Sequence, residues 1–483
     1  MRLLNIKNAL AIFSLVLLAS CGPKLDINTS PNTAITVSPD LIFNYALTAW
    51  SSNRTGGDSY IPFALLSQNQ ASGGNFGWGK GDVYDISPFS TGNTWRGYYA
   101  TSGNNFVLAI KQAESATPVN NNAAAQCKIL LANMMFEATT IWGDIPYSEA
   151  WKNDISYPKF DAQPEVFAGI LALLDKAIAQ IDMASPLKIG NYDLLYKGDM
   201  AKWKQYANSL KFKILMTMVD KDPSKAAAIG QLLTSNSMIN DASSNVLYPY
   251  TTESGKENPK FKVLKQYAGG ANLFFFANNN VYKYMAPLND PRIPVYFDYG
   301  PSDTSLTFIP VDTEDDADTL TSTINIKTLF KADAPDIIYT FQEQLFFEAE
   351  AYARGIGVAA NLAKADELYK KGISEAMKFY NVSGVNTNIY LTVVLSLPTA
   401  ANAINEIHKQ QWIDLMDRPQ EAFLQWRRSG TDATEFPQLV QPSGTPAGGF
   451  LRRWNYPQSA EIIPNVNAPK TAIPFTTKLW FDL

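Results

Sequence analysis

Apolar residues recur every three or four positions along much of the chain, which is the spacing of an amphipathic helix. The first clear run comprises Cys127, Leu131, Met134, Ala138 and Ile141. Gly143 and Pro146 follow it, and neither residue continues a helix well. Two more helices are expected behind the capping candidates Asp161 and Asp199. The pattern predicts a chain dominated by helices.

Two later runs predict a pair of neighbouring helices. One follows Asp336 and ends at Arg354-Gly355, and the other spans about 361–380. The second run alternates small and large residues on one face, at Ala365, Tyr369, Gly372 and Ala376. Stacked helical hairpins need such alternation, because a bulky side chain of one helix fills the gap beside a small residue of the next. We therefore predict an all-α fold of tetratricopeptide-like helical hairpins, with long irregular loops and little β-structure.

Three long stretches lack a clear period and are dense in Gly, Asn, Pro and aromatic residues. They span 51–105, 246–318 and 431–483. Irregular segments of this length usually carry function. We expect ligand binding in these stretches.

The N-terminus has the form of an export signal. Arg2 and Lys7 precede an apolar stretch, Ala9 to Leu18, that is too short to span a bilayer, because a spanning helix needs about 20 residues. The run from Leu18 to Cys21 resembles a bacterial lipobox, which implies that Cys21 is lipidated after cleavage. An ordinary secretory leader is the alternative. We predict a signal peptide over 1–20, an extended tether over 21–40 and a single domain over 41–483.

The composition narrows the class of partner. The 483 residues are 46% hydrophobic and 12% aromatic, but only 18% charged, with a formal net charge of −5. A protein that binds nucleic acid would carry a basic patch, so we do not expect nucleic acid as a partner of this chain. If Cys21 is acylated, Cys127 has no disulfide partner, and its position on an apolar helical face predicts a buried free thiol.

Catalytic and metal motifs are weak. The single histidine, His408, adjoins an apolar helical face, so we expect it to be structural. Residues 74–81 imitate a phosphate-binding loop, but Gly81 stands where a Ser or Thr hydroxyl is needed. No Gly-x-Ser-x-Gly motif is present either. We expect no catalytic residue.

Acidic residues alternate from Asp312 to Asp318 like the start of a calcium-binding loop. The sixth position of that loop needs Gly and holds Ala317, and the twelfth needs a bidentate Glu and holds Thr323. We expect no metal site and no cofactor, with Ca²⁺ kept as a minor alternative at this loop.

Aromatic residues cluster in the first irregular stretch, interleaved with glycine and polar residues. A flat ring can pack against the C–H face of a sugar while nearby polar groups bind its hydroxyls. The candidate ligand-binding residues are Asn75, Phe76, Trp78, Trp95, Tyr98 and Tyr99. We expect Trp78 and Trp95 to be exposed, since glycine and polar residues flank them. A core role is the alternative for any single ring.

Six strings along the chain resemble those of the SusD/RagB family of outer-membrane nutrient-binding lipoproteins, in its SusD-like branch. They are Asp26–Asn32, Trp142–Ala150, Gly198–Trp203, Asp290–Phe297, Trp426–Gly430 and Arg452–Ser459. They follow one another over nearly the whole mature chain. The strings themselves have the composition of scaffold, so they identify a family without identifying a ligand.

The resemblance implies a helical, lipid-anchored protein of the outer membrane that faces the cell exterior. It implies capture of nutrient, most often oligosaccharide, and its transfer to a TonB-dependent, SusC-like transporter. Three alternatives stay open: the same architecture with a peptide ligand, a lipid-anchored glycan hydrolase, and a protein-interaction scaffold without a small ligand. The missing catalytic motifs count against the hydrolase.

Overall fold

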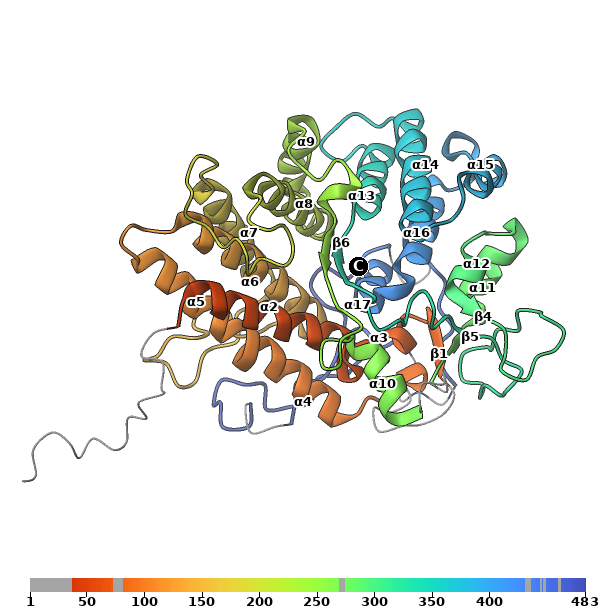
Figure 1. Ribbon diagram of the computed structural model, residues 1–483, viewed down its shortest axis with the longest axis horizontal. Helices are drawn as coiled ribbons and strands as arrows, with labels where there is room; N and C mark the ends of the chain where they lie inside the picture. Colours follow the sequence, from red (N-terminus) through yellow and green to blue (C-terminus); the bar gives the residue numbers. More distant parts are fainter. Residues whose placement is uncertain are drawn as a thin grey trace, which may run out of the picture. The chain divides into compact units, whose positions relative to one another are not determined.

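Helices form most of the chain (Figure 1). The computed structural model describes residues 37–72, 81–268, 274–430, 436–443, 445, 449–458 and 462–483. Residues Pro39–Leu483 form one compact unit. The predicted signal peptide and lipidation site Cys21 lie outside the described residues, as does nearly all of the predicted tether. The prediction of an all-helical fold with little β-structure is confirmed.

The central helix of the N-terminal half is α6, Asn121–Trp142, which is buried along almost its whole length. It packs between α5 (Asn104–Ser115) and α7 (Gln163–Gln180), and also contacts α2 (Pro39–Thr55) and α8 (Met200–Met218). Figure 1 shows these helices side by side. Asn120 caps the start of α6, and Gly143, with a φ of 84°, ends it as predicted.

The two predicted capping residues have different roles. Asp199 caps α8 by accepting hydrogen bonds from the backbone N–H groups of Ala201 and Lys202. Asp161 does not cap α7, whose N-cap is Ala162. The sequence could not show that Asp161 leaves the helix uncapped, because its carboxylate accepts hydrogen bonds from Ser148 in the preceding loop.

The predicted helix pair is present as α13 (Phe341–Arg354) and α14 (Leu362–Phe379), which pack against each other. Gly372 lies where the ring of Phe346 passes, since a Cβ built there would be 2.8 Å from a ring carbon. The small residue on one helix therefore accepts the large residue of the other, and the expected hairpin packing is confirmed. Helix α16 (Ala403–Asp414) covers α13.

The remaining helices and strands are short. The helices are α3 (Gly57–Leu66), α4 (Pro88–Arg96), α9 (Ala226–Ser235), α10 (Pro259–Ala268), α11 (Asn279–Met285), α12 (Ile293–Tyr296), α15 (Gly384–Val393) and α17 (Pro419–Arg427). One antiparallel sheet has the order β1 (Gln70–Ser72), β3 (Phe275–Ala277), β5 (Thr323–Ile324), β4 (Phe297–Asp298). The other pairs β2 (Val246–Tyr248) with β6 (Asp336–Tyr339).

The three stretches predicted to be irregular differ in outcome. The described part of 51–105 is mostly helical, so that prediction is wrong. The described part of 246–318 contains three α-helices, a 3-10 helix and three short strands among long loops. The described residues beyond α17 contain neither helix nor strand, as expected.

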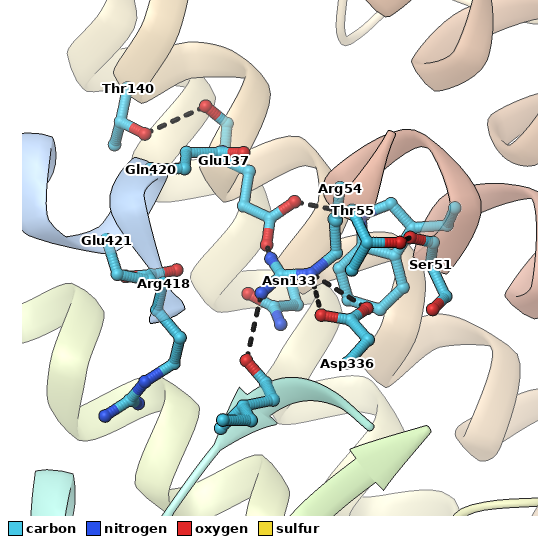
Figure 2. Close-up of polar contacts among 12 residues, drawn as sticks. Ser51, Arg54, Thr55, Asn133, Glu137, Thr140, Asp336, Arg418, Gln420 and Glu421 are labelled. Atoms are coloured by element: carbon cyan, nitrogen blue, oxygen red, sulfur yellow. Dashed lines mark hydrogen bonds and ion pairs between the residues drawn. The ribbon is translucent and has the colours of Figure 1, made fainter. Parts of the chain in front are cut away.

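A group of charged side chains lies in the core where α2, α6, α17 and β6 meet; we call it the buried ion network (Figure 2). Arg54 donates from Nε to both carboxylate oxygens of Asp336 at 3.2 Å and also pairs with Glu137. Glu137 accepts further hydrogen bonds from Trp50 Nε1 and the Tyr98 hydroxyl, each at 2.9 Å. A buried charge is costly unless it is paired, so these contacts fix the helices relative to one another.

The single histidine is structural, as expected. His408 is 1% exposed, and its Nε2 lies 3.2 Å from Glu350 Oε2. Arg428 binds the same carboxylate at 2.8 Å. Burial acts to raise the pKa of Glu350, but Arg428 and His408 outweigh it and hold the pKa well below its ordinary value. The histidine therefore joins α16 to α13.

Candidate functional site

A cleft of about 590 Å³ lies at the end of the α5–α6 pair, and five aromatic side chains line it. We call it the aromatic cleft. The rings are those of Trp95, Tyr99, Trp151, Tyr157 and Phe160. They come from α4, from the π-helix η3 (Gly97–Gly103) and from the loop after α6. Ile462, Pro464 and Asn465 of the C-terminal segment complete the lining.

The rings form a nearly continuous stacked wall. Trp95 and Tyr99 stack with centroids 4.5 Å apart, and Tyr99 stacks on Trp151 at 5.5 Å. Phe160 lies nearly parallel to Trp95 at 6.3 Å. Offset stacking of this kind stabilises each ring by about 0.5–1.5 kcal/mol beyond its buried area. The wall is therefore already formed in the folded chain.

The backbone around Trp151 is built to place its ring in the cleft. Trp151 has a φ of 58°, a conformation that costs energy for a bulky residue and recurs at functional sites. Its Nε1 donates to the carbonyl of Tyr99 at 2.8 Å. Gly103 makes room for the ring, because a Cβ there would be 2.2 Å from Trp151 Cζ2. A larger residue at 103 would push the tryptophan out of place.

The loop that carries Trp151, Tyr157 and Phe160 is closed at its base by Asp161. The backbones of Ile145 and Asp161 exchange two hydrogen bonds of 3.2 and 3.0 Å, and the carboxylate accepts from Ser148 N and Oγ, both at 2.7 Å. Burial acts to raise the pKa of Asp161, but these bonds and Lys159 outweigh it and lower the pKa. Asp161 therefore stays ionised and holds the loop, which explains why it does not cap α7.

Polar groups at the cleft are mainly neutral. Asn104 and Ser156 are exposed beside the rings, and Asn465 Nδ2 donates to the carbonyl of Pro158 at 2.9 Å. The Tyr99 hydroxyl donates to the carbonyl of Pro146 at 2.8 Å, and burial raises its pKa well above the ordinary value, so it stays protonated. Arg96 is the one charged residue in the cleft lining of the described chain.

The cleft lining contains no carboxylate among the described residues. A glycosidase needs a pair of carboxylates across its cleft. The buried ion network does contain carboxylates, but its cavity of about 20 Å³ has room for roughly one water molecule. Its acids are also paired, Asp336 with the guanidinium of Arg54 and Glu421 with the ammonium group of Lys213. The arrangement at the aromatic cleft is therefore suited to binding a ligand.

The candidate aromatic residues lie in three environments. Trp95 is 4% exposed, so the expectation that it is an exposed ring is wrong, although one side of it lines the cleft. Helix α4 turns it inward against Trp142, with ring centroids 5.0 Å apart. Tyr98 is 1% exposed, and its hydroxyl is bonded to Glu137, so its ring offers no exposed face. Tyr99 is half-buried and lines the cleft. Asn75, Phe76 and Trp78 lie outside the described residues.

Sequence reasoning missed three of the cleft aromatics, namely Trp151, Tyr157 and Phe160. Tyr157 is the most open of them, at 47% exposed. The adjacent string Trp142–Ala150 has the composition of scaffold, so it gives no indication that the loop after it forms a binding site. Aromatic residues beside Pro158 in a polar segment were the signal available for finding this loop.

The acidic loop does not gather its carboxylates at one point. Asp312 accepts from Asn279 Nδ2 at 2.7 Å, while Asp318 accepts from the backbone N–H groups of Leu320 and Thr321. Within the described chain, no group of three or more His, Cys, Asp or Glu residues is placed to hold a metal ion. The Ca²⁺ alternative therefore gains no geometric support.

No helix among the described residues combines the length and apolar character needed to cross a bilayer.

Comparisons with known proteins agree along the chain. The family model SusD-like_2, described as "Starch-binding associating with outer membrane", matches residues 31–457. No curated protein sequence matches.

Several solved structures share the fold. A Bacteroidetes SusD-like protein gives a TM-score of 0.76 at 19% identity, covering 92% of this chain and 100% of its own. A SusD homologue from Bacteroides vulgatus gives 0.75 at 19% identity, with 90% and 97% covered. A chitin-binding SusD homologue from Flavobacterium johnsoniae gives 0.73 at 20% identity, with 91% and 98% covered. At such identities the likeness establishes the fold alone.

Proposed function

The chain belongs to the SusD-like family, and we propose that it is a non-catalytic binding protein of the outer membrane that captures oligosaccharides. The observation that carries the proposal is the aromatic cleft, in which stacked rings lie beside neutral polar groups. Rings of this kind bind the C–H faces of sugars, and amide and hydroxyl groups bind their hydroxyls. The family description and the chitin-binding structural neighbour support the same class of ligand.

The proposal extends to the setting of the protein. We propose that Cys21 carries the lipid anchor, that the protein faces the cell exterior, and that a TonB-dependent transporter of the SusC-like class receives the ligand. The lipobox-like run at Leu18–Cys21 and the family membership support this. Metabolic labelling with palmitate should mark the native protein and should not mark Cys21→Ser. Equal labelling of both would overturn the assignment of the anchor.

Ligand binding is tested with a form that begins at Gly22 and so keeps the compact unit Pro39–Leu483. Calorimetry against malto-oligosaccharides, chito-oligosaccharides and short peptides should give saturable binding to an oligosaccharide. Tyr157→Ala should weaken it about three- to tenfold, the equivalent of about 0.5–1.5 kcal/mol for one ring contact. Tyr45→Ala is the matched control, because Tyr45 is 56% exposed on α2 and does not line the cleft.

Each other outcome has a distinct meaning. Loss of binding in Trp78→Ala but not in Tyr157→Ala would move the binding contact from Tyr157 to the segment that carries Trp78. Binding of peptides alone would change the cargo. Binding of nothing in the panel would contradict the capture role and favour a scaffold.

A further inference from the structure

A second hollow of about 500 Å³ lies beside the aromatic cleft. The C-terminal segment lines it, chiefly through Asn455, Tyr456, Gln458, Ile462 and Lys470. Ile462 lines both hollows. Tyr456 connects them as well, because its ring lies edge-on to Phe160 at 5.3 Å and to Trp95 at 6.2 Å. The two hollows are therefore neighbours along one surface.

Ile462, which lines both hollows, is buried, and so is Tyr456 of the second hollow. Ile462 is 6% exposed and Tyr456 is 8% exposed, so neither of these two side chains projects into solvent. We propose that the aromatic cleft and the second hollow form one groove, which binds an unbranched oligosaccharide long enough to occupy both. This inference rests on the proposed function.

Hydrogen bonds fix the two parts of the groove relative to each other. The Tyr456 hydroxyl donates to the carbonyl of Asp144 at 2.5 Å. Asn465 Nδ2 donates to Pro158 O in the cleft loop at 2.9 Å, and Lys470 Nζ donates to Asn465 O at 2.7 Å. The C-terminal segment is thus held against the loop that carries the cleft aromatics. A preformed groove loses less conformational freedom on binding than one assembled by the ligand.

The chemistry of the two parts differs. The cleft offers stacked rings, whereas the second hollow offers the exposed amides of Asn455 and Gln458 and the hydroxyl of Thr471. Amides and hydroxyls both donate and accept, which suits sugar hydroxyls. The lining of the second hollow in the described chain includes no carboxylate. One sugar segment would stack in the cleft while the next is held by hydrogen bonds.

Each hollow falls within the range of about 300–1,000 Å³ that small-molecule sites occupy. A short oligosaccharide can therefore bind in the cleft alone, whereas only a longer oligosaccharide reaches Asn455 and Gln458. Affinity should rise with chain length until both hollows are filled. Ligand length is then the property that this groove selects.

The test is calorimetry with malto- and chito-oligosaccharide ladders, from the disaccharide to the hexasaccharide. The wild type should bind the hexasaccharide of the preferred series more tightly than the disaccharide. The double variant Asn455→Ala/Gln458→Ala should weaken hexasaccharide binding about three- to tenfold, the loss expected for one or two neutral hydrogen bonds. It should leave disaccharide binding within about twofold. Gln231→Ala, an exposed glutamine on α9, is the control and should change neither.

The outcomes separate this inference from the function beneath it. If the wild type binds the disaccharide and the hexasaccharide equally, or the double variant binds both like the wild type, the groove is overturned while oligosaccharide capture stands. An equal loss at every length would also overturn it, because the substitutions would then act through the cleft. If no sugar in either ladder binds the wild type, the proposed function itself fails.

Discussion

Replacement of Glu137 tests whether the buried ion network holds the core together. Glu137 lies on α6 and is 1% exposed. Its carboxylate pairs with Arg54 and accepts hydrogen bonds from Trp50 Nε1 and the Tyr98 hydroxyl. Glu137→Ala would leave a buried guanidinium short of one partner and the buried Trp50 Nε1 without an acceptor, while the Tyr98 hydroxyl would keep only Gln420 Oε1, at 3.4 Å.

The magnitude follows from these contacts. Removing one member of a buried ion pair costs about 3–5 kcal/mol, and each orphaned buried donor costs about 1–3 kcal/mol. The costs are not additive, and Asp336 still faces Arg54 at 3.2 Å. We expect Glu137→Ala to lower the free energy of unfolding by about 3–5 kcal/mol. Glu137→Gln keeps the shape and one acceptor oxygen, so it should cost about 1–3 kcal/mol.

The assay is urea unfolding followed by tryptophan fluorescence, which ten Trp residues make sensitive. Glu165→Ala is the control, because Glu165 is exposed on α7 and should shift the free energy of unfolding by no more than about 0.5 kcal/mol. If Glu137→Ala lost less than about 1 kcal/mol, the reasoning would be refuted. The network would then contribute little to stability, as surface ion pairs do.

Three further predictions concern packing, pH and reactivity. Gly372→Ala should destabilise the protein by about 1–2 kcal/mol in urea unfolding, because the new Cβ would meet Phe346. Gly384→Ala, where no atom lies within 4 Å of the new Cβ, should be neutral or stabilising by up to about 1 kcal/mol. Equal effects of the two substitutions would contradict this prediction. Burial acts to raise the pKa of Glu350, but Arg428 and His408 outweigh burial and lower the pKa. The stability that ionised Glu350 contributes is therefore complete above the unfolded-state pKa of about 4.3, and it is lost as the pH falls through the lower folded-state pKa. The loss caused by Glu350→Gln should therefore be largest near neutral pH and shrink below about pH 4 in urea unfolding; a penalty independent of pH would refute it. Burial raises the pKa of the Cys127 thiol, which is 0% exposed, so iodoacetamide should label it only after unfolding, and rapid labelling of the native protein would contradict its burial.

The elements that could be predicted from the sequence are those that local signals determine. The period of α6, the cap at Asp199 and the small-large alternation of α14 each depend on residues within a few turns of one another. The packing of α13 on α14 follows because Gly372 has no side chain and so leaves room for the ring of Phe346. Local periodicity and local packing agreed, and the helices formed where expected.

The stretch 51–105 was mispredicted because two of its described glycines serve tertiary contacts. Gly97 and Gly103 lie in the π-helix, where they make room for Asn53 and Trp151. From the sequence alone, glycines among aromatic residues favour a loop. Trp95 was expected to be exposed because polar residues flank it in the sequence. Those neighbours lie on other faces of α4, so they do not indicate the exposure of Trp95 itself.

The aromatic cleft could not be predicted as a site because its walls are far apart in the sequence. Pro158 and Asn465 are joined by a hydrogen bond across 307 positions. Tyr99 was a candidate, but nothing local placed Trp151 against it. Only the folded chain brings these residues together.

The cleft and the core are two sides of one helical segment. Tyr98 points into the buried ion network and bonds Glu137, while the next residue, Tyr99, forms part of the cleft wall. A core contact and a ring of the cleft wall therefore lie on adjacent residues, and a wall that is held in place binds with little loss of conformational freedom. If the core contact and the ring are coupled, Glu137→Gln should weaken oligosaccharide binding although Glu137 does not line the cleft, while Glu165→Gln should not. Unchanged binding in Glu137→Gln, measured where the variant is fully folded, would show that the cleft wall keeps its geometry without the core contact.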